Sequence, residues 1–145
     1  MPILTALIFL LTATRESTPN EEITVIVSGI EAERGGNLMV LIFSEKGFPI
    51  EHRHALAMQS KKVTGKTMIF KFKASVTRQL AFKALHDEDS NHKVTKNWTG
   101  IIPAEGLGFS RGAKLGAFGP PDFEDAEVTR TQALKHPITL QMIYP

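Results

Sequence analysis

The sequence predicts an all-β fold: a single antiparallel β-sandwich of about seven strands, with Greek-key connections and one long structured loop. Short segments that alternate or are apolar throughout recur along the chain, and turns rich in glycine, proline or asparagine separate them. No segment has the periodicity of an amphipathic helix longer than two turns. The 145 residues include no cysteine, so a buried core alone has to hold the fold.

The first two strands are expected at residues 22–30 and 38–44. The former alternates, whereas the latter is almost wholly apolar, as is typical of a central strand buried on both faces. Gly35 and Gly36 lie between them and tolerate positive φ, so we expect a tight turn that joins the two strands in a hairpin. Further strands are expected at residues 61–74, 78–86, 123–131 and 137–144, while residues 45–59 show no clear pattern.

The charge is small overall but unevenly distributed. A net charge of +2 does not favour binding to nucleic acid. Residues 52–86 contain no aspartate or glutamate but several lysines and arginines. Two interpretations stay open: this is the solvated outer face of a sheet, or Lys71, Lys73 and Lys83 form a surface that attracts an anionic partner.

The N-terminal residues 1–17 predict a cleaved signal peptide followed by a single domain at 18–145. Their apolar part, residues 2–13, is shorter than the roughly 20 residues that a membrane-spanning helix needs. No lysine or arginine precedes it, so an extra strand is the alternative. We expect an exported protein, periplasmic or secreted, with no integral membrane segment after signal removal.

The loop at residues 86–110 is the most informative part of the chain. It opens with oxygen-bearing side chains at every second position, Asp87, Asp89 and Asn91. This spacing lets side-chain oxygens converge on a hard cation, as they do in calcium-binding loops. The sequence therefore raises the hypothesis of a calcium (Ca²⁺) site on these three residues.

Two features of a calcium loop are missing. His92 stands where a glycine normally makes the sharp bend, and Trp98 stands where the twelfth-position glutamate would be. The favoured alternative is that Asp87, Asp89 and Asn91 cap their own turn through hydrogen bonds to the backbone.

The same candidate binding loop contains His86, Glu105, Trp98 and Phe109. Glu105 reaches the aspartates only if the loop folds back; alternatively it points inward and accepts hydrogen bonds from loop amides, which is the interpretation we favour. Trp98 and Phe109 form either an aromatic platform for a sugar or peptide, or a small core that plugs the end of the sandwich.

Two functions follow from these residues. The first is a non-enzymatic binding or structural module, and the second is a metal- or carboxylate-dependent hydrolase that uses the 86–110 loop. An enzyme requires Glu105, Asp87 or His86 to converge on one open cleft. Ser110 lacks the G-x-S-x-G pattern of a nucleophilic serine, so no catalytic residue is assigned.

The combination of motifs in the second half of the chain resembles one bacterial exported family, known as domain of unknown function 2141. The matching segments are residues 86–89 (HDED), Asn91, 100–101 (GI), 103–110 (PAEGLGFS) and 119–126 (GPPDFEDA). The resemblance implies a small exported β-sandwich, similar to transthyretin-like or prealbumin-like domains, with no established activity. The chain departs from the family pattern where Ser90 and His92 replace glycines and Thr95 replaces an aspartate.

Overall fold

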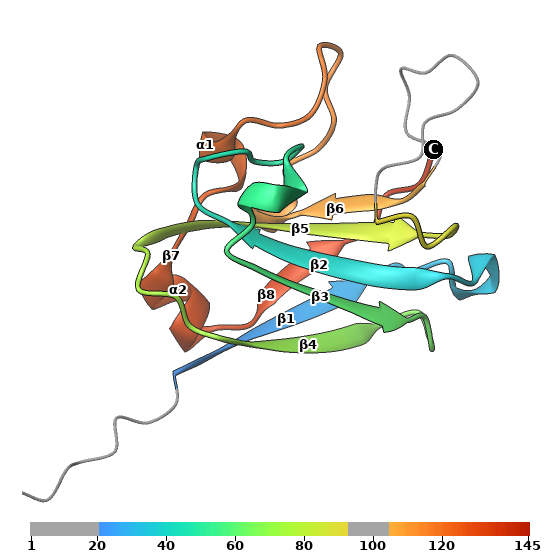
Figure 1. Ribbon diagram of the computed structural model, residues 1–145, viewed down its shortest axis with the longest axis horizontal. Helices are drawn as coiled ribbons and strands as arrows, with labels where there is room; N and C mark the ends of the chain where they lie inside the picture. Colours follow the sequence, from blue (N-terminus) through green and yellow to red (C-terminus); the bar gives the residue numbers. More distant parts are fainter. Residues whose placement is uncertain (1–20, 93–104) are drawn as a thin grey trace, which may run out of the picture.

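The computed structural model describes residues 21–92 and 105–145, which form two β-sheets packed face to face (Figure 1). One sheet has the strand order β4-β1-β8, and the other has the order β3-β2-β5-β6 with β7 paired to β5. The strands are β1 (Glu22–Ser28), β2 (Asn37–Phe43), β3 (Ala57–Lys62), β4 (Met68–Lys73), β5 (Gln79–Asp87), β6 (Leu107–Phe109), β7 (Val128–Thr129) and β8 (Ile138–Gln141). The helices are short: η1 (Ala32–Arg34), η2 (His52–His54), η3 (Ser110–Gly112), α1 (Phe123–Ala126) and α2 (Arg130–Lys135).

The all-β sandwich predicted from the sequence is confirmed, with eight strands in the described part of the chain. The strand pairs are antiparallel except for β1 and β8, which run parallel. Within residues 21–92 and 105–145, no helix is long and apolar enough to cross a membrane.

The expected hairpin of the first two strands is wrong, because β1 and β2 lie in different sheets. β1 is buried on one face only and pairs with β4 and β8. β2 is buried on both faces, so it needs cover on each side and pairs with β3 and β5. The connection through η1 and two glycines with positive φ, Gly35 and Gly36, therefore crosses from one sheet to the other.

Two other predicted strands were also wrong in extent. Residues 61–74 divide between the end of β3 and β4, which belong to different sheets. Residues 123–131 contain α1, β7 and the start of α2 instead of one strand. Each of these helices begins with a capping box, Asp122 with Asp125 and Thr129 with Gln132, and such reciprocal side-chain bonds to the first-turn amides favour a helix locally.

The apolar side chains form two clusters, one on each face of the larger sheet. The main cluster fills the space between the sheets and includes Val25, Val40, Phe70, Phe82 and Leu140. The second cluster lies on the outer face and consists of Met39, Leu41, Phe43, Leu85, Leu107 and Phe109, with Phe48 packed against it. The segment 44–56, most of which falls within residues 45–59 where the sequence shows no clear pattern, supplies Phe48 and so covers this outer face.

Close packing explains a glycine in β6. A Cβ atom at Gly108 would lie 2.8 Å from the backbone oxygen of Gln141, a contact that cannot be relieved by turning a side chain. The short strand β6 therefore approaches β8 only because position 108 has no side chain.

We expect Gly108→Ala to lower the free energy of unfolding by about 1–3 kcal/mol, because the added methyl group forces β6 and β8 apart. Gly65→Ala is the matched control, since the nearest atom to its new Cβ lies 3.9 Å away. Denaturant unfolding of both variants measures the difference, and equal stabilities would contradict this account of the β6–β8 contact.

Candidate functional site

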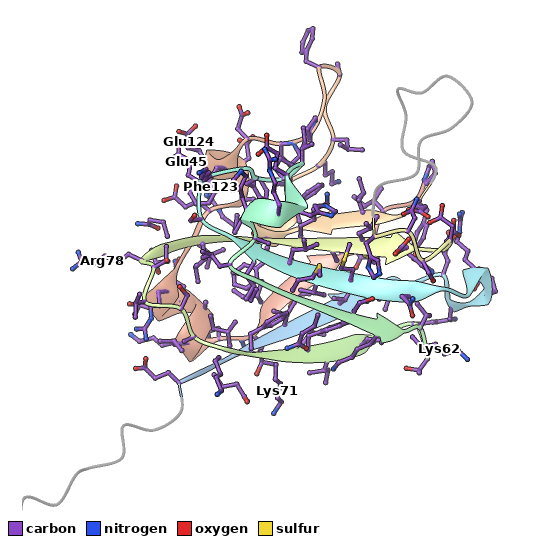
Figure 2. The ribbon with its side chains drawn as sticks, in the orientation of Figure 1. Glu45, Lys62, Lys71, Arg78, Phe123 and Glu124 are labelled. Carbon is purple, nitrogen blue, oxygen red and sulfur yellow. The ribbon has the colours of Figure 1, made fainter. Side chains whose placement is uncertain are left out.

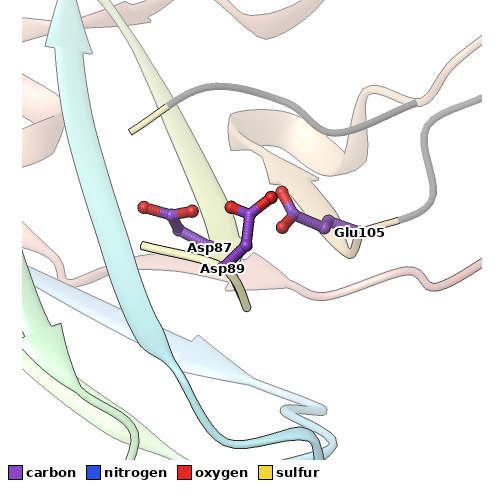
Figure 3. A group of neighbouring side chains, drawn as sticks. All are labelled: Asp87, Asp89 and Glu105. Carbon is purple, nitrogen blue, oxygen red and sulfur yellow. The ribbon is translucent and has the colours of Figure 1, made fainter. Parts of the chain in front are cut away.

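Three carboxylates meet where β5 ends and β6 begins (Figure 3). Asp87 is the last residue of β5, Asp89 lies two residues further along the chain, and Glu105 comes two residues before β6. The backbone N–H of His86 donates to the carbonyl of Gly106 at 3.0 Å, which continues the β5–β6 pairing and brings Glu105 beside Asp87. Oxygen atoms of the three carboxylates all lie within 4.8 Å of one another. The chain thus folds back, as a role for Glu105 beside the aspartates requires.

Two of these carboxylates are buried and hold the turn together. Asp87 is 0% exposed and Glu105 is 3% exposed, whereas Asp89 lies at the surface. Asp87 accepts hydrogen bonds from the backbone N–H groups of Asn91 at 3.0 Å and His92 at 2.8 Å. Glu105 accepts one from the backbone N–H of Glu88 at 3.1 Å. The inward orientation expected for Glu105 is therefore observed, and the capping interpretation describes Asp87 well.

Asn91 takes part mainly as a donor. Its backbone N–H contacts Asp87 and, at 3.3 Å, Asp89, and its side-chain Nδ2 donates to Asp89 at 3.1 Å. The amide group would have to turn for its oxygen to face the carboxylates. The assignment of Asn91 as a metal ligand therefore stays a prediction.

The turn also contains backbone strain. Ser90 and His92 have φ of 56° and 60°, a left-handed conformation that costs a residue with a side chain about 1–2 kcal/mol. The hydrogen bonds to Asp87 help to offset this cost, because they fix the backbone of Asn91 and His92.

His86 is buried and both of its ring nitrogens are engaged. Its Nε2 lies 2.6 Å from the carbonyl oxygen of Gly35, so Nε2 carries the hydrogen and donates it. Nδ1 therefore accepts from the hydroxyl of Tyr144 at 2.6 Å, and this hydroxyl accepts from the backbone N–H of Glu31 at 3.0 Å. Burial raises the pKa of Tyr144, and the Arg34 guanidinium stacks over its ring. His86 thus acts as a structural group that joins β5 to two other segments.

Of the two aromatic candidates, Phe109 and Trp98, the structure describes Phe109. Phe109 is buried in the second apolar cluster, with its ring centroid 6.0 Å from that of Phe48, so it forms part of a core. Trp98 lies outside the described residues. Ser110 is also structural, since its hydroxyl accepts from the backbone N–H of Phe82 and donates to the carbonyl of Ala126.

One member of the expected basic surface, Lys83, is buried and does not lie on that surface. Lys71 and Lys73 are exposed on β4, but Lys83 is only 3% exposed. Its Nζ donates to the carbonyl of Pro49 at 2.8 Å and to Nε2 of His52 at 2.9 Å, and burial lowers its pKa to about 8.

The reason for the burial of Lys83 is that the 44–56 segment covers this face of β5. Sequence reasoning missed this site because no pattern predicted the cover. One signal was present: alternation places Lys83 on the same face as Ala81 and Leu85, which is an apolar face.

The family model described as "Uncharacterized protein conserved in bacteria (DUF2141)" matches residues 25–136. The chain belongs to this family. The matched region contains the whole carboxylate cluster and the covered face of β5, and the resemblance predicted from the sequence motifs is confirmed. No curated protein and no solved structure is significantly similar to this family member.

We expect the stability of the wild-type protein, relative to Lys83→Met, to rise with pH from about 8 to 10.5. A base whose pKa is lowered by folding binds its proton more weakly in the folded state than in the unfolded state. The free-energy cost of burying the charged amine therefore disappears as the pH rises past the pKa of the unfolded state. A lowering from 10.5 to about 8 corresponds to about 3 kcal/mol. Denaturant unfolding of both proteins across this range measures the effect, and a difference that does not change with pH would rule it out.

Proposed function

We propose that this protein is a small, exported, non-enzymatic β-sandwich module that binds a hard divalent cation, calcium by preference. The binding residues are Asp87, Asp89 and Glu105. The observation that supports this most directly is the convergence of their carboxylates from two segments of the chain, with oxygens within 4.8 Å of one another.

Electrostatics favours a cation at this position. Two unit charges about 4 Å apart repel by about 4 kcal/mol at an effective dielectric constant near 20, and here three carboxylates are grouped. Asp87 and Glu105 are held in place by hydrogen bonds from the backbone. A divalent cation among these oxygens would convert the repulsion into attraction.

The donor atoms favour calcium over softer metals. All three groups offer oxygen, which suits calcium and magnesium and does not suit ions that prefer sulfur. Calcium accepts six to eight oxygen ligands in a flexible geometry, whereas magnesium needs a near-ideal octahedron. Asp89 is exposed, so water can complete the coordination of an ion that enters beside it.

A hydrolase is the weaker alternative, because the groups that it would need are engaged in internal contacts. Both ring nitrogens of His86 are bonded, and Asp87 and Glu105 accept hydrogen bonds from the turn. No observation on the described residues favours catalysis over binding.

Export follows from the sequence of residues 1–17, which lie outside the described residues. We expect the mature protein to start near residue 18 and to be found in the periplasm or the medium. The intact mass of the protein recovered from these fractions tests this, and a mass that includes Met1 would argue against cleavage.

We expect millimolar calcium to raise the free energy of unfolding in comparison with chelator. A ligand that binds only the folded state stabilises it by RT ln(1 + [L]/Kd), which is about 4 kcal/mol at a thousandfold excess over Kd. Thermal unfolding with calcium, magnesium, zinc or chelator, together with calorimetric titration, measures the effect and the preference among the ions.

Two variants identify the site. Asp89→Asn removes the exposed charge with little cost to the fold, and Glu105→Gln keeps an acceptor for the N–H of Glu88. Both should lose the response to calcium, whereas the control Glu45→Gln, an exposed acid on another segment (Figure 2), should keep it. Equal melting curves of the wild type with calcium and with chelator would contradict the proposal.

A further inference from the structure

The segment 44–56 is fastened to the outer face of the larger sheet at a small number of points. Phe48 packs into the second apolar cluster, with its ring centroid 5.6 Å from that of Phe43. The backbone N–H of Leu56 donates to the carbonyl of Ile42 at 2.7 Å, where the segment leads into β3. Between these points, Lys83 on β5 reaches the segment with two polar contacts, to Pro49 and to His52. In Figure 1 the short helix η2, which contains His52, lies next to β5.

His52 has to be neutral for this contact to exist. The Lys83 ammonium has only hydrogens to donate, so Nε2 of His52, 2.9 Å away, accepts with its lone pair. The hydrogen of the ring then sits on Nδ1, which donates to the carbonyl of His92 at 3.1 Å. One imidazole thus joins η2 to the middle of β5 and to the turn after β5.

We propose that Lys83 and His52 form an acid-released latch: uptake of a proton by His52 frees the 44–56 segment from the sheet and uncovers the second apolar cluster. This inference does not depend on cation binding at the carboxylate cluster.

A second proton cannot be accommodated in the closed arrangement. It would place an N–H on Nε2, directly facing the Lys83 ammonium, so an acceptor would be replaced by a donor and two cations would share a partly buried site. Lys83 cannot withdraw, because β5 is a central strand. His52 lies on a short helix at the surface side and can move outward.

The other charged groups around His52 do not reverse its preference for the neutral form in the closed arrangement. Asp87 and the carbonyl of His92 favour the protonated form, but burial and Lys83 outweigh them and lower the pKa of His52. On the 44–56 segment, Glu51 is engaged with His54 at 2.9 Å and Arg53 at 3.5 Å.

The sign of the pH dependence follows. The latch is fully effective above the unfolded histidine pKa of 6.5 and weakens as the pH falls below it. Release would remove Phe48 from contact with Phe43 and Phe109, and so expose aromatic surface that is covered at neutral pH.

Hydrogen exchange with mass spectrometry on the full chain tests the latch, in chelator so that no cation contributes. After correction for the intrinsic pH dependence of exchange, peptides from residues 45–56 are expected to open on the order of tenfold more at pH 5 than at pH 7.5. Peptides from β1 should stay protected, because the main core is intact. Unchanged opening of 45–56, or equal loss of protection in β1, would overturn the proposal.

His52→Gln is the decisive variant, since glutamine can still accept from Lys83 and donate to His92 but does not titrate. It should keep 45–56 protected at both pH values. His54→Gln on the same short helix is the matched control and should behave as the wild type does. A transition that persists in H52Q, or disappears in H54Q, would overturn the assignment to His52. If H52Q does not fold, the hydrogen exchange of residues 45–56 at the two pH values in the wild type and H54Q still tests the proposal.

Discussion

The burial of β5 on both faces is the constraint from which most of the other features follow. Eight of its nine residues are buried, and three of these, Lys83, His86 and Asp87, are polar or charged. A buried polar group without a partner costs on the order of 1–3 kcal/mol, so each of the three needs a specific contact. No buried side-chain nitrogen or oxygen in the described part of the chain lacks a hydrogen-bond partner.

Each polar residue of β5 recruits a different segment of the chain. Lys83 binds the 44–56 segment, His86 binds the connection at Gly35 and the C-terminal Tyr144, and Asp87 binds the turn that follows. The strand is therefore both the centre of the larger sheet and the point to which four irregular segments are attached. This explains why a chain with short helices and long connections holds those connections in defined positions.

The carboxylate cluster and the Lys83–His52 contact are linked by their position on this strand. His52 donates to the carbonyl of His92, whose own N–H donates to Asp87. The turn between these bonds has two residues other than glycine, Ser90 and His92, in the left-handed conformation. The hydrogen bonds of Asp87 and His52 hold the turn in that conformation and help to offset its cost.

The sequence by itself determined the fold class, the double burial of β2 and, to within one residue at each end, the extent of β5, and it favoured the inward orientation of Glu105. These depend on local patterns: alternation, apolar content, and polar side chains that need backbone partners. The capping boxes at Asp122 and Thr129 were equally local, and the sequence contained enough to predict α1 and α2.

Only the tertiary structure decided which strands pair and what covers each face. Proximity along the chain suggested a hairpin of β1 with β2, but alternation shows which face of a strand is buried and not which strand lies beside it. Lys83 is the clearest case, because its burial depends on the 44–56 segment, which has no periodic pattern of its own. Cover of this kind comes from contacts between residues far apart in the sequence, and no local pattern encodes it.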